Sequence, residues 1–123
     1  MAIVRYFVDD VEKCVEFYTK VLGFKVNFSY KVFVEIAKED LTIWISGPET
    51  SAARPMSDGE KPIPGGWNRI VLQVESMDDT VKMLKSHRTV FRNEPFTGVG
   101  GKQLLIEDPS GNKIEISEPK QRS

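Results

Sequence analysis

Apolar residues along the chain follow two different spacings, and each spacing predicts one kind of secondary structure. In two stretches they recur every three or four residues, which places them on one side of a helix. These residues are Val11, Cys14, Val15, Tyr18 and Leu22 in the first stretch, and Met77, Val81 and Leu84 in the second. Shorter runs rich in β-branched and aromatic residues surround both stretches and predict strands. We expect these strands at residues 3–8, 24–29, 31–37, 41–46, 67–74 and 89–93, followed by a hairpin within residues 101–117.

Particular residues mark the ends of the two predicted helices. Asp9, followed by Glu12 three residues later, has the spacing of a capping box and predicts the start of the first helix. Gly23 fits the left-handed residue that commonly follows a helix. Ser76, with Asp79 three residues later, predicts the start of the second helix. Both helices therefore have a defined beginning in the sequence.

The final hairpin combines a turn motif with strict alternation. Residues 108–112 read Asp-Pro-Ser-Gly-Asn, in which Pro favours a tight turn and Gly and Asn tolerate positive φ angles. In the strand that follows, polar and apolar residues point to opposite sides of the sheet. The polar side carries Lys113, Glu115 and Ser117, and the apolar side carries Ile114 and Ile116. Glu115 therefore stands on a polar sheet face, beside residues that other strands supply.

The second half of the chain repeats the first. One constant shift places Val8 on Val74 and Val15 on Val81, and a second constant shift places Ile43 on Ile114. The repeat predicts an α+β fold of two tandem β-α-β-β-β modules, whose curved mixed sheets surround a cup, with one helix on the outer face of each sheet. The predicted single domain has module one at residues 1–47, a linker at 48–66, module two at 67–117 and a solvated tail at 118–123.

Composition and charge exclude several classes of function. The formal net charge is −1, so the chain offers no basic surface for nucleic acid or for an anionic membrane. No apolar run approaches the roughly 20 residues needed to span a bilayer, and the N-terminal residues do not resemble a signal peptide. A single cysteine rules out an internal disulfide. Together these features indicate a cytoplasmic protein.

Three isolated side chains require an interpretation. Cys14 lies on the apolar stripe of the first helix, which indicates a buried small hydrophobe rather than a nucleophile. His87 falls near the end of the second helix beside Lys85 and Arg88, where a cationic side chain suits the helix dipole, and we do not expect it to bind a metal. We expect Trp67 to pack against the linker. The alternatives are that Trp67 helps to close the cup or lies at a subunit boundary.

Three segments carry a resemblance to a known family. They read VDDVEKCVEFYTKVLGFKV at residues 8–26, NRIVLQVESMDDTVKML at 68–84 and EDPSGNKIEI at 107–116. With the repeat, they resemble the vicinal oxygen chelate superfamily, which includes glyoxalase I, bleomycin-resistance proteins and extradiol dioxygenases. The resemblance covers nearly the whole chain and implies the same two-module fold.

The resemblance also implies where a metal would be bound. Metal-dependent members place two ligands in each module: one residue early on the first strand, five positions before a Val, and a Glu on the last strand. The corresponding residues in this chain are Ile3, Trp44, Arg69 and Glu115. Zinc, iron or manganese needs about three nitrogen, oxygen or sulfur ligands, and this set supplies one. We therefore expect no metal and no cofactor.

Alternation predicts which side chains line the cup. The predicted ligand-binding residues are Arg5, Phe7, Phe33, Glu35, Trp44, Arg69, Gln73 and Glu115. We expect Arg69 and Glu115 to form a bidentate salt bridge, the alternative being that Arg69 extends to solvent. For Trp44, the alternative to a ligand contact is core filling. The glycine-rich residues 98–101 are expected to form a connecting loop at the rim, with a flap over the cup as the alternative.

Three functions are consistent with these residues. The first is a metal-free protein of the bleomycin-resistance type, a cytoplasmic homodimer that binds a small organic molecule, cationic or aromatic, in the cup. The second is a metal-dependent lyase, isomerase or dioxygenase of the glyoxalase type. The third is a metal-independent enzyme in which the apolar cup raises the pKa of Glu35 or Glu115, so that it serves as a general base. The incomplete metal-ligand set favours the first function.

Overall fold

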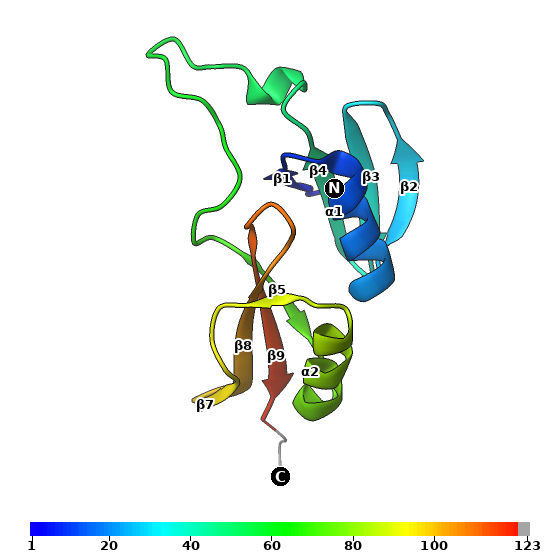
Figure 1. The fold of residues 1–123 in the computed structure, drawn as a ribbon, viewed down its shortest axis with the longest axis vertical. Helices are drawn as coiled ribbons and strands as arrows, with labels where there is room; N and C mark the ends of the chain where they lie inside the picture. Colours follow the sequence, from blue (N-terminus) through cyan, green and yellow to red (C-terminus); the bar gives the residue numbers. More distant parts are fainter. Residues whose placement is uncertain (121–123) are drawn as a thin grey trace. The chain divides into compact units, whose positions relative to one another are not determined.

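The computed structural model describes residues 1–120, which divide into two compact units (Figure 1). The first unit consists of Met1–Gly65 and of the hairpin loop Pro109–Asn112. The second consists of Gly66–Asp108 and of the chain from Lys113 onward. Each unit contains one sheet of mixed parallel and antiparallel strands, and helical segments lie against it. Among the described residues, no helix is both long enough and apolar enough to span a membrane.

The first unit contains a four-stranded sheet in the order β1-β4-β3-β2. Its elements are β1 (Val4–Phe7), α1 (Val11–Glu16), the π-helical η1 (Phe17–Val21), β2 (Lys25–Ser29), β3 (Phe33–Lys38), β4 (Leu41–Ser46) and the short 3-10 helix η2 (Ser51–Ala53). β1 runs parallel to β4, and the other pairs are antiparallel. α1 contacts β3 and β4, and the core between them contains the buried Cys14, Tyr18, Ile36, Ile43 and Ile45.

The second unit contains a five-stranded sheet in the order β5-β9-β8-β6, with β7 paired to β8. Its elements are β5 (Ile70–Gln73), α2 (Met77–Ser86), β6 (Val90–Phe91), β7 (Phe96–Gly98), β8 (Gly101–Glu107) and β9 (Lys113–Pro119). α2 contacts β9. The core contains Met77, Leu84, Leu104, Ile106, Ile114 and Ile116, all buried.

Strand pairing confirms the internal repeat residue by residue. The parallel pair of the first unit places Arg5 opposite Trp44, and the parallel pair of the second unit places Val71 opposite Glu115. The two constant shifts read from the sequence relate these pairs to one another. Because the register is the same, the repeat extends from the order of the elements to the face on which each side chain lies.

The helix caps also repeat, but the first lies one residue later than predicted. Asp10, not Asp9, caps α1, and its Oδ1 accepts a hydrogen bond of 3.0 Å from the backbone N–H of Lys13. The backbone N–H of Asp9 instead donates to the Ser110 hydroxyl at 2.9 Å. Ser76 caps α2 as predicted, accepting from the N–H of Asp79 at 3.2 Å. The two caps are equivalent positions of the repeat.

The glycine-rich residues 98–101 form the tight end of a β-hairpin. Strand β7 was not predicted, and it pairs with β8 so that Gly98 lies opposite Gly101. Gly101 has a φ of 131°, and a Cβ atom there would collide with the backbone carbonyl of Glu118. Only glycine fits this position, because its neighbours are backbone atoms that cannot move aside. The connecting loop is therefore the tight turn between β7 and β8.

The last strand continues into the predicted tail. β9 reaches Pro119, and the carboxylate of Glu118 accepts a hydrogen bond of 2.8 Å from the backbone N–H of Met77, at the start of α2. The prediction of a solvated tail from residue 118 is therefore wrong for Glu118, because the side chain satisfies a helix N–H that has no partner within the helix. Residues 121–123 of the predicted tail lie outside the described residues.

Candidate functional site

Each sheet has one face against a helix and one face without a helix. In the first unit, alternation buries Val34, Ile36, Ile43 and Ile45 on the side of α1. The opposite side, which we call the helix-free face of the first sheet, carries the half-buried Arg5, Phe33, Glu35 and Trp44. The structure therefore places these four predicted residues on one face. Trp44 is half-buried and is not among the buried core residues.

A row of polar contacts holds Trp44 in place on this face. The Trp44 Nε1 donates to Glu35 Oε1 at 2.9 Å, and the Asn27 amide donates to Glu35 Oε2 at 2.8 Å. On the other side of the indole, the guanidinium carbon of Arg5 lies 5.0 Å from the ring centroid. Arg5 also reaches the Ser46 hydroxyl, at 3.5 Å. The indole is thus fixed from both neighbouring strands, with a cation over its ring.

Hydrogen bonds set the ionisation of Glu35. The bond from Trp44, and then the bond from Asn27, lower the pKa of Glu35 from its ordinary value of 4.5 and outweigh the effect of burial, which would raise the pKa. Both bonds favour the charged carboxylate, which accepts from each donor. The hypothesis of a Glu35 general base with a raised pKa is therefore wrong, because the two hydrogen bonds stabilise the charged carboxylate and lower its pKa.

Aromatic rings continue from Trp44 toward the edge of the sheet. The ring centroids of Phe33 and Trp44 are 5.3 Å apart, and Tyr30 and Phe28 lie 5.0 Å and 6.1 Å from Phe33. Phe28 and Tyr30 are exposed and were not predicted as site residues. The signal was obscured because a β-bulge between Val26 and Phe28 shifts the alternation of β2.

Phe7, the remaining predicted residue of the first unit, lies at the end of β1. It is half-buried and pairs in register with Ser46. Its backbone carbonyl accepts a hydrogen bond of 2.8 Å from the side chain of Asn112, in the hairpin loop that belongs to this unit. Within residues 1–120, no ring contact joins Phe7 to the aromatic row. Phe7 therefore contributes to the attachment of the hairpin loop.

The second unit has the predicted ion pair on its own helix-free face. Arg69 Nε lies 3.1 Å from Glu115 Oε1, and the two side chains are 34% and 20% exposed. The salt bridge is thus present, and its shortest contact runs through Nε. Gln73, the other residue predicted here, is exposed and pairs with Ser117.

A second group of charged residues surrounds Trp67. The indole is 67% exposed, so the expected packing against the linker is wrong. Instead, the Lys113 Nζ lies 5.1 Å and the Arg92 Cζ 5.9 Å from the ring centroid. Both cations also contact Glu107 Oε2, Lys113 at 3.3 Å and Arg92 at 3.4 Å. Sequence periodicity could not find this group, because Trp67 and Arg92 lie outside the strands.

The positions that bind a metal in the resembled enzymes do not fit a metal in this chain. Ile3 and Trp44 offer no lone pair to a cation, and the Glu115 carboxylate is paired with Arg69. Among the described residues, no group of three or more His, Cys, Asp or Glu side chains is arranged to hold a metal ion. The chemistry of these positions is therefore one of ion pairing and stacking.

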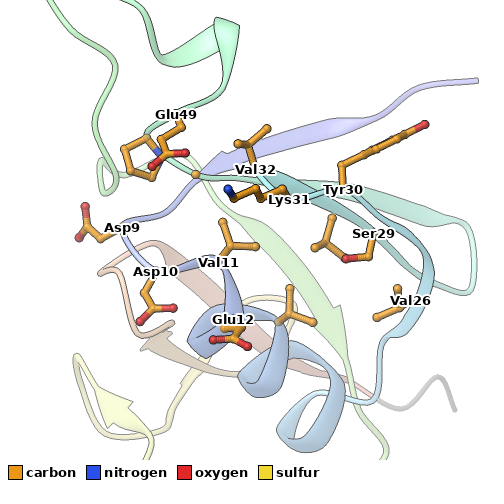
Figure 2. Close-up of a pocket in the computed structure, with 14 residues that line it drawn as sticks. Asp9, Asp10, Val11, Glu12, Val26, Ser29, Tyr30, Lys31, Val32 and Glu49 are labelled. Carbon is orange, nitrogen blue, oxygen red and sulfur yellow. The ribbon is translucent and has the colours of Figure 1, made fainter.

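A cavity of the first unit lies on the opposite, helix side of its sheet. It has a volume of about 730 Å³ and opens between α1, the turn from β2 to β3 and the residues after β4 (Figure 2). Its apolar lining comes from Val11, Val15, Val26, Val32 and Val34, and its charged residues are Asp9, Asp10, Glu12, Glu49 and Lys31. This groove could not be predicted from the sequence, because its lining residues come from four separate segments.

A protein-family model and one curated relative cover most of the chain. The family model, described as the Glyoxalase/Bleomycin resistance protein/Dioxygenase superfamily, matches residues 1–116. A phenazine antibiotic resistance protein, EhpR from Enterobacter agglomerans, is 26% identical over 119 residues, which cover 89% of this chain and 84% of that protein.

Solved structures share the fold over nearly their whole length. A member of the same superfamily from Sphaerobacter thermophilus has a TM-score of 0.77 and 25% identity, and the match covers 96% of this chain and 95% of that chain. TnmS3, an antibiotic binding protein from Streptomyces sp. CB03234, has a TM-score of 0.74 and 20% identity, with 96% and 93% covered. At this identity, the similarity to TnmS3 shows a shared fold and nothing more.

Proposed function

Because the chain belongs to the glyoxalase/bleomycin resistance protein/dioxygenase superfamily, we propose that it is a binding protein for a planar aromatic small molecule and works without a metal. The observation that carries the proposal is the Trp44 indole, fixed between Arg5 and Glu35 on the helix-free face of the first sheet. A ring that is already ordered loses little conformational entropy when a ligand stacks on it.

The composition of this face supports an aromatic ligand over a cationic one. Aromatic pairs contribute about 0.5–1.5 kcal/mol beyond the area that they bury, and Phe33, Tyr30 and Phe28 extend the aromatic surface beyond Trp44. The carboxylate of Glu35 accepts one hydrogen bond at each oxygen, so it is engaged within the protein. Arg5 adds a positive charge that disfavours a ligand cation.

The curated relative supports a sequestering role. It is a resistance protein against a phenazine antibiotic. Binding alone would protect a cell from a planar aromatic toxin, and it requires none of the metal ligands that this chain lacks. The proposal includes a homodimer in the cytoplasm, and sedimentation of the purified protein over a range of concentrations tests the dimer.

Fluorescence quenching tests the aromatic ligand directly. The chain has two tryptophans, so the variant Trp67→Phe leaves Trp44 as the sole indole. We expect uncharged phenazine to quench this indole saturably. In that background, Phe33→Leu should weaken binding about tenfold, which corresponds to about 1.4 kcal/mol. As a control, Phe17→Leu removes a ring from η1, and it should leave the affinity unchanged.

Two results would contradict the proposal. An absence of saturable quenching by phenazine and by related tricyclic rings would refute the aromatic ligand. Stoichiometric zinc, iron, nickel or manganese in the protein as purified, measured by elemental analysis, would refute the metal-free function. The two measurements are independent, since the first reports on the ligand and the second on the ion.

A further inference from the structure

The helix-free face of the second sheet exposes apolar side chains together with an indole. The exposed fraction is 67% for Trp67, 50% for Val71 and 49% for Phe96. Val71 pairs in register with Glu115 and Phe96 with Gln103, so both lie on the face opposite the apolar core residues Ile114 and Leu104. Large apolar surface on a sheet face that no helix covers is typical of a binding surface.

The charges on this face are unevenly matched. Its carboxylates, Glu107 and Glu115, are both in ion pairs, Glu115 with Arg69 and Glu107 with both Arg92 and Lys113. The cations therefore exceed the carboxylates in this group of described residues, and two of them adjoin the Trp67 ring. A ligand that stacks on Trp67 would meet positive charge at the ring edge.

Arg92 retains hydrogen-bond donors for a ligand. A guanidinium carries five N–H groups, and Glu107 contacts Arg92 through Nε at 3.4 Å. That carboxylate is shared with Lys113, and the Arg92 side chain is 47% exposed. Arg92 can therefore take a second planar anion at its terminal nitrogens without giving up Glu107.

We propose that this face binds a planar aromatic anion, such as an aromatic carboxylate. The ring stacks on Trp67, and the carboxylate pairs with Arg92, with Lys113 adding positive charge. The inference rests on the proposed function for the planar aromatic character of the ligand, and it adds the ligand's charge and the residues that select it. A cationic ring would be repelled here, because the nearby carboxylates are already paired.

One ring system in three charge states tests whether the site prefers an anionic ligand. Acridine carboxylate, acridine at mildly alkaline pH and N-methylacridinium are the anionic, neutral and cationic probes. In Trp44→Phe, which leaves Trp67 as the sole indole, we expect the anion to quench saturably and to bind about tenfold more tightly than neutral acridine, as one charge-assisted hydrogen bond implies. The cation should bind most weakly, and added salt should reduce the anion's advantage.

Arg92→Gln should remove the advantage of the anion while leaving the affinity for neutral acridine within about twofold, since cation–π contact contributes little at exposed sites. Arg88→Gln, which removes an exposed arginine beyond the end of α2, is the matched control and should retain the advantage. Calorimetric titration of the wild-type protein and of the single variant Arg92→Gln compares the affinities for the same probes without a Trp44 substitution.

The possible failures are distinguishable. If no probe binds to either single-indole variant, the proposed function fails together with this inference. If neutral acridine quenches Trp44 but the anion has no advantage at Trp67, the inference fails while the proposed function stands. If Trp67 fluorescence responds to protein concentration and to none of the probes, a second copy of the chain covers the face, and the inference is overturned.

Discussion

The ion pair between Arg69 and Glu115 gives a quantitative prediction, because the chain contains an exposed pair for comparison. We consider Arg69→Ala, Glu115→Gln and the double variant. The two side chains are 34% and 20% exposed and 3.1 Å apart. Lys20 and Glu16, on the first helical stretch, are 70% and 66% exposed and 3.6 Å apart. The Arg69–Glu115 pair is therefore both closer and less exposed to solvent than the Lys20–Glu16 pair.

The magnitude follows from the exposure of each pair. Fully exposed pairs contribute about 0–1 kcal/mol, and helix pairs four residues apart about 0.3–0.5 kcal/mol, which we expect for Lys20 and Glu16. Removing one partner of a buried pair costs about 3–5 kcal/mol. Because Arg69 and Glu115 are partly screened, we expect Arg69→Ala to lower the free energy of unfolding by about 1–2 kcal/mol, and the coupling energy of the pair to be about 1 kcal/mol.

Urea denaturation of the four proteins of a double-mutant cycle measures the coupling energy for each pair. Glu115→Gln should cost less than Arg69→Ala, because it removes the charge and leaves no unpaired carboxylate in the sheet. The reasoning would be refuted by a coupling energy between Arg69 and Glu115 no larger than that between Lys20 and Glu16. It would also be refuted if Arg69→Ala left both stability and ligand binding unchanged.

Three further predictions concern single positions. Because hydrogen bonds lower the pKa of Glu35, their stabilising effect is fully present above the ordinary value of 4.5 and is lost as the pH falls through the lowered value. The fluorescence of Trp44 in the Trp67→Phe variant should therefore change only below pH 4.5. Glu35→Gln should abolish this change in fluorescence. Gly101→Ala should lower the free energy of unfolding, measured by urea denaturation, by about 2–4 kcal/mol, because the new Cβ atom would collide with the backbone carbonyl of Glu118. A loss below about 0.5 kcal/mol would contradict this prediction. Asp10→Ala should cost about 1 kcal/mol through loss of the helix cap, whereas Asp9→Ala should cost clearly less; equal losses would restore Asp9 as the cap.

Local pattern determined the elements and their faces. The apolar stripes predicted both helices, and alternation in β3, β4 and β9 predicted which side chains are buried against a helix. Alternation also predicted that Arg5, Glu35 and Trp44 share one face, and the strand pairing confirms it. These features are accessible from sequence because helix and strand periodicities depend on neighbouring residues.

The tertiary structure decided what each site residue touches. Asn27 lies at the bulge of β2 and donates to Glu35, and that bond helps to lower the pKa that the general-base alternative required to be raised. Trp67 meets Arg92 and Lys113 from three segments far apart in the chain. Periodicity assigns a side chain to a face, but hydrogen bonds and ring contacts depend on distances between strands and loops that no local pattern contains.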